Sequence, residues 1–130
     1  MSMSLHVFNA AGYIRLSRED GDKEESDSVG NQRKLLTEYI DKEDGLCLYG
    51  FYIDDGYTGT SFRRPDFQRM MTDIEGGRVN CVIVKDLSRF GRDYIDAGRY
   101  LERYFPEKGV RFISISDGID SIKQSYGMLL

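Results

Sequence analysis

A short apolar run, Cys81–Val84, followed at once by the charged segment Lys85–Arg92, constrains the fold most. Four consecutive apolar, mostly β-branched residues predict a strand that is buried on both faces, as in a parallel sheet covered by helices. The charged segment holds three cations, an acid and a hydroxyl group. In open α/β sheets, ligands bind just beyond the carboxyl ends of the strands. This segment is therefore predicted to lie where chemistry would take place.

Strands and helices are predicted to alternate along the chain. Further strands are expected at 9–16, 47–53 and 110–115, which are rich in aromatic and aliphatic side chains. Between them, helices are expected after the N-cap residue Ser28, from Pro65 onward, and over 93–105. This order predicts an α/β fold with a mostly parallel central sheet of about four to five strands and helices on both faces.

Length and composition indicate one soluble domain. A chain of 130 residues, 40% hydrophobic and 31% charged, is large enough to bury a core of its own. No apolar run approaches the roughly 20 residues that a membrane helix needs, and the first residues do not form a secretory signal. Cys47 and Cys81 lack the spacing of metal ligands. We therefore expect a cytoplasmic protein with reduced cysteines, no bound metal and no membrane partner.

The distribution of charge bears on nucleic-acid binding. A net charge of −4 argues against a chain that binds DNA by itself. Acids outnumber bases within 17–55, whereas bases outnumber acids within 60–103, the half that contains the charged segment. An anion site is compatible with that half, but most of the affinity for a polyanion would have to come from elsewhere.

Polar side chains follow every predicted strand, and parallel strands end at one edge of a sheet. The segments concerned are Arg15–Ser17, Asp55–Arg64, Lys85–Arg92 and Asp117–Asp120. Arg89 and Arg92 are three residues apart, so one helical turn would point both guanidinium groups the same way. Converging guanidinium groups match phosphate oxygens and stabilise the charge that a phosphodiester gains in the transition state. The edge is therefore predicted to act on a phosphate.

Five segments in this order resemble the catalytic domain of serine recombinases, the resolvase/invertase family. They are Tyr13-Ile14-Arg15-Leu16-Ser17, Asn31-Gln32-Arg33, Asp54-Asp55-Gly56-Tyr57-Thr58-Gly59, Arg64-Pro65 and Val84-Lys85-Asp86-Leu87-Ser88-Arg89-Phe90-Gly91-Arg92. The resemblance covers about residues 10 to 120. The acidic segment 18–27 and the Asp-Gly-Tyr-Thr-Gly sequence are most similar to the large serine recombinases of mobile elements.

The resemblance implies a site-specific DNA recombinase in which Ser17 attacks a DNA phosphate and leaves a 5′-phosphoserine link and a free 3′-hydroxyl. The arginines implied around the scissile phosphate are Arg15, Arg64, Arg89 and Arg92. The supporting positions implied are Tyr13, Gln32, Asp55 and Thr58. Ser88 stands where resolvases typically carry an acid. The resemblance thus leaves the proton donor for the 3′-oxygen missing, or replaced by Asp86 or Asp55.

Partners and domain limits are also implied by the resemblance. It predicts double-stranded DNA as the partner, dimers and tetramers of the full-length protein, and no cofactor, because the phosphoserine link conserves the bond energy. Residues 1–130 are expected to be the catalytic domain, truncated before the long dimerisation helix and the DNA-binding region. The sequence contains no helix-turn-helix or zinc-binding pattern. We therefore expect the 130-residue chain alone to be inactive on DNA.

Two other functions are compatible with these residues. Four acids, Asp54, Asp55, Asp117 and Asp120, would hold Mg²⁺ in a metal-dependent phosphoryl-transfer or receiver-type domain. A non-catalytic module would use the arginines only to hold an anion. The residues alone do not choose between Ser17 and Ser88 as nucleophile, and the family resemblance selects Ser17.

Overall fold

The structure is a computed structural model that describes residues 7–16 and 28–123. Within these residues, a five-stranded sheet forms the centre of the protein. Its strand order is β2-β1-β3-β4-β5. The strands are β1 (Phe8–Leu16), β2 (Leu46–Asp55), β3 (Cys81–Val84), β4 (Arg111–Ser114) and β5 (Ile119–Asp120). The first four are parallel to one another, and β5 pairs antiparallel with β4 at the edge. The predicted mostly parallel α/β sheet is confirmed.

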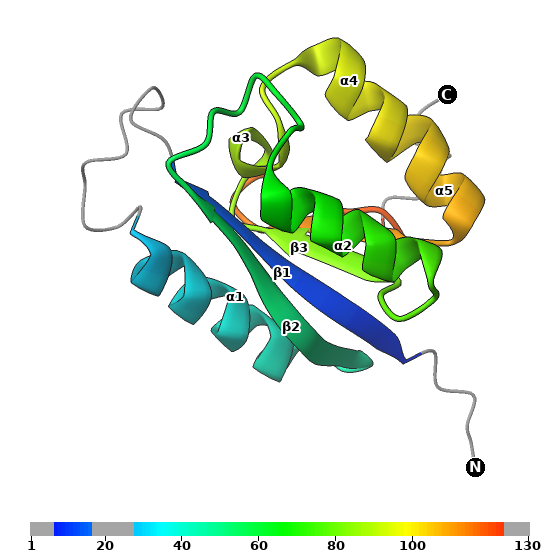
Figure 1. The fold of residues 1–130 in the computed structure, drawn as a ribbon. Coiled ribbons are helices and arrows are strands. Elements are labelled where there is room, and N and C mark those ends of the chain that lie inside the picture. The colour runs from blue at the N-terminus through cyan, green and yellow to red at the C-terminus, as the bar shows by residue number, and fades with distance from the viewer. Residues whose placement is uncertain (1–6, 17–27, 124–130) are drawn as a thin grey trace.

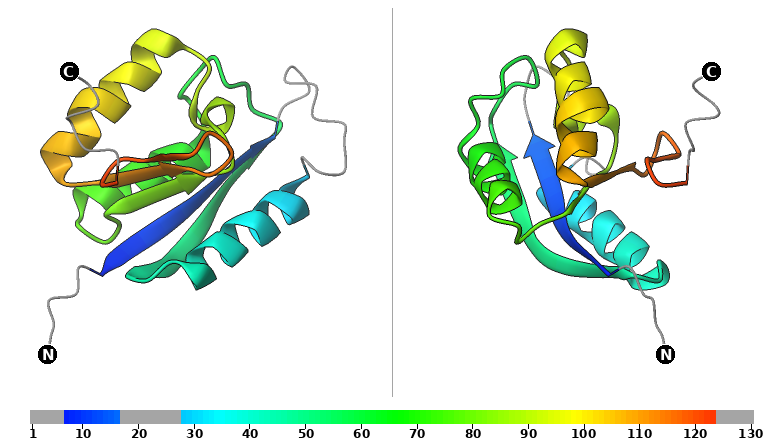
Figure 2. Two further views of the ribbon diagram at one scale, coloured as in Figure 1. Left: turned by 180° about the vertical axis from the view of Figure 1, so that it is seen from behind. Right: turned by 90° about the vertical axis from the view of Figure 1, so that its right-hand side faces the viewer.

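Helices cover both faces of the sheet, also as predicted (Figure 1). On one face lies α1 (Val29–Lys42), and on the other lie α2 (Pro65–Glu75) and a helical segment made of α4 (Tyr94–Gly98), η3 (Arg99–Tyr104) and α5 (Phe105–Lys108). Figure 2 shows the same layers from behind and from the side. The single turn α3 (Leu87–Phe90) follows β3 at the carboxyl edge.

The central strands are buried on both faces, which explains their continuous apolar sequence. In β3, the odd-numbered residues pack with the core on the α1 side and the even-numbered residues with the core on the α2 side. β1 alternates in the same way, with Ile14 on the α1 side and Tyr13 on the α2 side. Alternation along a strand thus decides which polar residues at its end face α2.

Local sequence signals set the starts of two helices. The Ser28 side chain accepts a hydrogen bond of 3.1 Å from the Asn31 amide, as an N-cap does. Pro65 occupies the first turn of α2, where its missing amide proton removes no helical bond. Among the described residues, no helix is long and apolar enough to cross a membrane.

Three element boundaries differ from those predicted. β2 continues through Asp54 and Asp55 because both pair with β1. The helix predicted over 93–105, with Pro106 and Gly109 closing it, continues through Pro106 to Lys108. Pro106 lies in the first turn of α5, directly after the π-helical η3, and a proline is tolerated in the first turn of a helix. Gly109 then ends the helix with a left-handed φ of 70°.

The third difference concerns the polar turn predicted at 117–120. Its second half, Ile119–Asp120, forms β5 through pairing with Ser114 and Ile113. Asp120 is buried there and binds Arg111 with bonds of 2.9 and 2.6 Å, so the ion pair holds the short strand against its neighbour. Asp120 therefore stabilises the sheet rather than joining the polar residues at the carboxyl edge.

Substitution of Phe67 tests the assignment of the core on the α2 side. It is fully buried, and its ring contacts Tyr13, Phe62, Phe90 and Tyr100 with centroid distances of 5.0–5.7 Å. We expect Phe67→Ala to lower the free energy of unfolding by about 3–5 kcal/mol, measured by chemical denaturation. The control Ile95→Ala, at a position that is 70% exposed, should change it by less than about 0.5 kcal/mol. Equal effects would contradict the assignment of this core.

The two cysteines should differ in reactivity. Burial raises the pKa of the Cys81 thiol to about 12, so almost no thiolate exists at pH 8, whereas Cys47 is exposed on β2. We expect iodoacetamide at pH 8 to label Cys47 in the native protein and to leave Cys81 unmodified, as read by peptide mass spectrometry. Both should react in denaturant. Rapid native labelling of Cys81 would contradict the placement of β3.

Candidate active site

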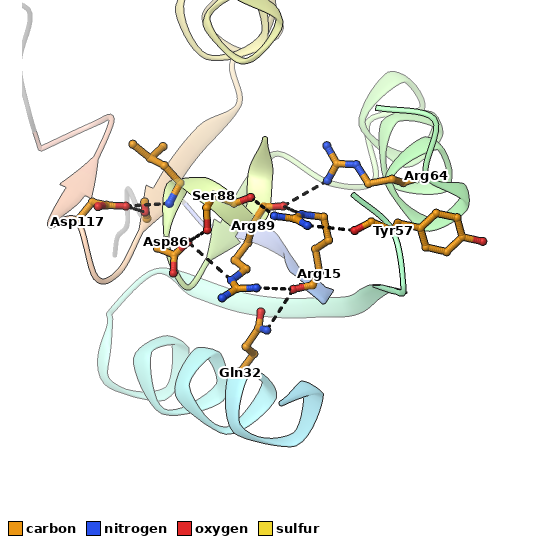
Figure 3. A network of polar contacts seen from close by, with 10 residues as sticks. Arg15, Gln32, Tyr57, Arg64, Asp86, Ser88, Arg89 and Asp117 are labelled. Carbon is orange, nitrogen blue, oxygen red and sulfur yellow. Dashed lines mark hydrogen bonds and ion pairs between the residues drawn. The ribbon is translucent and has the colours of Figure 1, made fainter. Parts of the chain in front are cut away.

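Three buried arginines meet at the carboxyl edge of the sheet, and we call Arg15, Arg64 and Arg89 the arginine cluster (Figure 3). Arg15 comes from the end of β1, Arg64 directly precedes α2, and Arg89 lies in α3. Their relative exposures are 0%, 1% and 5%. Buried guanidinium groups need hydrogen-bond partners, and these three find them mainly on the backbone.

Arg15 and Arg64 bind the last carbonyl groups of α3. A one-turn helix leaves these carbonyls without partners of its own. Arg15 donates from Nε to the carbonyl of Arg89 at 3.2 Å and from Nη2 to that of Ser88. Arg64 donates from Nη2 to the carbonyl of Phe90 at 2.7 Å and from Nη1 to that of Arg89 at 3.3 Å. Two guanidinium groups thus cap the end of α3.

The backbone of β1 is held from the opposite direction. Arg89 donates from Nη1 to the carbonyl of Arg15 at 3.0 Å, and Gln32 of α1 donates to the same oxygen at 3.2 Å. Arg15 also reaches the carbonyl of Tyr57 in the loop after β2, at 3.0 Å. Four segments are therefore tied together two residues before Ser17. Ser17 itself lies outside the described residues.

A second network links the cluster to the start of α2. Arg64 donates from Nη1 to the hydroxyl of Tyr13 at 2.9 Å, and this hydroxyl donates to Asp54 at 2.7 Å. The Asp54 carboxylate accepts the amides of Asp66 and Phe67, both at 2.9 Å, in the first turn of α2. A carboxylate is favourable there because those amides have no partner inside the helix.

The pKa values in this network follow from burial. Burial raises the pKa of the Tyr13 hydroxyl far above its ordinary value, so the group keeps its proton and can donate to Asp54. Burial also lowers the pKa of the Arg64 guanidinium, and the adjacent Tyr13 hydroxyl opposes that shift. The Tyr13 hydroxyl thus remains a hydrogen-bond donor to Asp54 and an acceptor from Arg64.

Asp54, rather than Asp55, joins this network. The resemblance implied Asp55 as a supporting residue, but the structure places it exposed at the end of β2. Tyr52 and Asp54 are both buried and both bind residues of α2, through Asp73 and the first-turn amides respectively. The alternation of side chains along β2 was the signal that could have selected Asp54 from the sequence.

Arg92 lies beside the cluster and is exposed. The prediction that Arg89 and Arg92 share a helical turn is wrong, because α3 ends at Phe90 and Gly91 is extended, with φ −179° and ψ 146°. The Arg92 amide donates to the carbonyl of Gly59 at 2.8 Å. A Cβ at Gly59 would come within 2.7 Å of Arg15 and 2.9 Å of Arg92, so a larger residue there would displace one of these side chains.

The two remaining predicted hydroxyls have different surroundings. Ser88 is partly buried and donates to Asp86, whose carboxylate also lies 3.7 Å from Nε of Arg89. Thr58 bonds within its own loop, to the hydroxyl and the amide of Thr60 at 3.0 and 3.2 Å. Of the two, the structure brings Ser88 into contact with the cluster.

The acids of the metal-dependent alternative are not brought together. Asp54 binds the amides of α2, Asp120 binds Arg111, and Asp117 binds the first amide of α3. Within 7–16 and 28–123, no group of three or more His, Cys, Asp or Glu side chains is placed to hold a metal ion. Asp54, Asp117 and Asp120 are thus occupied by donors from the protein itself.

Comparison with known proteins assigns the family. The sequence profile of the family described as "Resolvase, N terminal domain" matches residues 10–130. The chain belongs to this family. The resemblance inferred from the five ordered segments is confirmed.

Two solved structures agree with this assignment, and one curated protein is similar over about half of the chain. The N-terminal catalytic domain of TP901-1 integrase superposes on this resolvase domain with a TM-score of 0.79 and 29% identity, over 93% of this chain and 86% of that one. A resolvase family site-specific recombinase from Streptococcus pneumoniae gives 0.73 and 31%, over 94% and 80%. The uncharacterized immunity region protein 3 of Bacillus phage phi105 is 35% identical over 69 residues, which are 53% of this chain and 82% of that protein.

Asp54 and Asp55 provide a matched pair of variants in this resolvase domain. In Asp54→Asn the amide group cannot accept all the bonds that Tyr13 and α2 now donate, so we expect the free energy of unfolding to fall by about 2–3 kcal/mol. Asp55→Asn changes an exposed side chain and should alter stability by less than about 0.5 kcal/mol. Chemical denaturation of both variants checks this, and the reverse order would contradict the network.

Proposed function

We propose that the chain is the catalytic domain of a site-specific DNA recombinase that cuts and rejoins strands with Ser17 as its nucleophile. The observation that carries this proposal is the arginine cluster, which surrounds the end of β1. Ser17 is the next residue in the sequence after Leu16, the last residue of that strand. The family assignment supports the same activity.

The cluster has the chemistry to receive a phosphodiester. In the described state its guanidinium groups donate to neutral backbone carbonyls. Hydrogen bonds from a cation to a charged oxygen are about twice as strong as those to a neutral one. A phosphate that enters the site would therefore compete for these donors, and the competition strengthens as charge accumulates on the phosphorus oxygens. Arg92, beside the cluster, would add a further cation from the solvent side.

The reaction balances without a cofactor. The Ser17 hydroxyl loses its proton as its oxygen attacks phosphorus, the bond from phosphorus to the 3′-oxygen breaks, and that oxygen takes up a proton. The 5′-phosphate stays on Ser17. A 3′-hydroxyl then attacks the phosphoserine, regenerates the serine and forms a new phosphodiester. One phosphate ester replaces another at each step, so no nucleotide is consumed.

We assign the proton transfer at the 3′-oxygen to the Asp86–Ser88 pair rather than to Asp55. Ser88 takes the place where resolvases typically carry an acid, and its hydroxyl bonds Asp86 beside Arg89. Asp55 is exposed. A hydroxyl that shares a proton with a carboxylate can pass one to a neighbouring oxygen.

Partners and location follow from the substrate. We infer that double-stranded DNA is bound largely by parts of the full-length gene product outside residues 1–130, because this chain carries a net charge of −4. Dimers and tetramers would bring two DNA sites together, as the family resemblance implies. Reaction with genomic or mobile-element DNA places the protein in the cytoplasm.

Ser17→Ala in the full-length gene product is the direct test. We expect the unmodified protein to form a covalent complex with DNA that carries its recombination site, stable in detergent and digestible to a peptide with phosphate on Ser17. Ser17→Ala removes the attacking oxygen and should abolish the complex. Denaturing gel electrophoresis and mass spectrometry measure both outcomes.

Ser88→Ala is the control for nucleophile identity. It should still form the covalent complex, more slowly, because Ser88 takes part only in proton transfer. EDTA should leave the reaction unchanged, which separates it from metal-dependent chemistry. A phosphate mapped to Ser88, or a fully active Ser17→Ala protein, would overturn the proposal.

A further inference from the structure

We propose that Asp117, in the turn between β4 and β5, is a positioning residue that fixes α3 and through it the arginine cluster. This inference rests on the proposed function, because it concerns the geometry of the same site. The Asp117 carboxylate bonds the Leu87 amide and the Ser114 hydroxyl rather than the arginines of the cluster. It acts on the backbone that carries Arg89 and that supplies the carbonyl acceptors of Arg15 and Arg64.

The contact lies at the first residue of α3. Oδ2 of Asp117 accepts the amide of Leu87 at 2.8 Å, from 30 positions further along the chain. The residue at the N-cap position, Asp86, does not cap the helix with its own side chain. Its carboxylate instead accepts the Ser88 hydroxyl and pairs with Arg89. Asp117 therefore caps the first amide of α3, and the Asp86 carboxylate can bind Ser88 and Arg89 instead.

The carboxylate of Asp117 is itself held in place. The Ser114 hydroxyl, at the end of β4, donates to the same Oδ2 at 2.6 Å. The turn closes through Gly118, whose φ of 66° is left-handed and whose amide donates to Ile115 at 3.1 Å. The Ser116 amide donates to Lys85, just before α3, at 2.7 Å. The turn is thus fastened to the segment that it caps.

The other end of α3 shows why this matters. A one-turn helix has almost no stability of its own, since nucleating a helix is unfavourable. α3 is held by Asp117 at its first amide and by Arg15 and Arg64 at its last carbonyls. If the bond from Asp117 to the Leu87 amide is lost, α3 can shift. Arg89 then shifts with it, and so do Arg15 and Arg64, which bind its carbonyls. Misplacement by about 1 Å can cost about 10²-fold in rate.

Global stability depends much less on Asp117. Its side chain is exposed, and removing it creates no cavity in the core. The loss of one cap is equivalent to about a fivefold change in an equilibrium constant. A positioning role therefore predicts a change in cleavage rate that exceeds the change in folding stability.

The test compares Asp117→Ala and Asp117→Asn with the parent in the full-length gene product. In Asp117→Ala we expect the rate of covalent complex formation at saturating DNA to fall by clearly more than fivefold, toward about 10²-fold, with the dissociation constant for DNA unchanged. Amide exchange at Leu87, measured by NMR on the 130-residue chain, should accelerate about fivefold. Asp117→Asn keeps one acceptor oxygen, so both values should be intermediate.

Asp73→Ala is the matched control. Asp73 also accepts side-chain hydrogen bonds, here from Tyr52 and Arg78, but it lies on α2 and its bonds are not to α3. It should lower stability without slowing cleavage at saturating DNA. If Asp73→Ala slows cleavage as much as Asp117→Ala, or if Asp117→Ala cleaves at the parent rate, the positioning role is overturned. A parent protein that forms no covalent complex would instead refute the proposed function, and Leu87 exchange would still decide whether Asp117 caps α3.

Discussion

The capping of α3 by arginine side chains is the interaction on which the candidate site depends. Arg15 and Arg64 satisfy carbonyls that a one-turn helix cannot satisfy by itself. The same bonds bury three cations next to one another, which would be unfavourable without acceptors around each guanidinium group. The α3 turn, the arginine cluster and the end of β1 therefore stabilise one another, because each supplies hydrogen-bond partners to the others.

This arrangement gives the arginines two tasks that share one geometry. In the described state they bind backbone oxygens, and in the proposed reaction they would bind phosphate oxygens. The exchange of neutral acceptors for charged ones needs little movement of the side chains. Preorganised donors of this kind lower the barrier because the protein does not have to reorganise during the reaction.

Carboxylates accept hydrogen bonds from the first amides of two helices. Asp54 reaches from β2 to the first amides of α2, and Asp117 reaches from the β4–β5 turn to the first amide of α3. Asp54 therefore fixes α2, which directly follows Arg64, and Asp117 fixes α3, which contains Arg89. From the sequence, Asp54 and Asp117 are both possible metal ligands. The sequence does not show that backbone amides donate hydrogen bonds to their carboxylates.

The order of strands and helices, the burial of β3 on both faces and the edge at which polar residues gather could all be predicted from the sequence. These follow from periodicity, caps and breakers, which act over a few residues. Three outcomes required the folded structure: Tyr13 and the first amides of α2 are the partners of Asp54, Arg92 lies outside the turn that holds Arg89, and a short β5 pairs with β4. Those outcomes depend on contacts between segments distant in sequence, and no local pattern records which distant group will satisfy a buried polar atom.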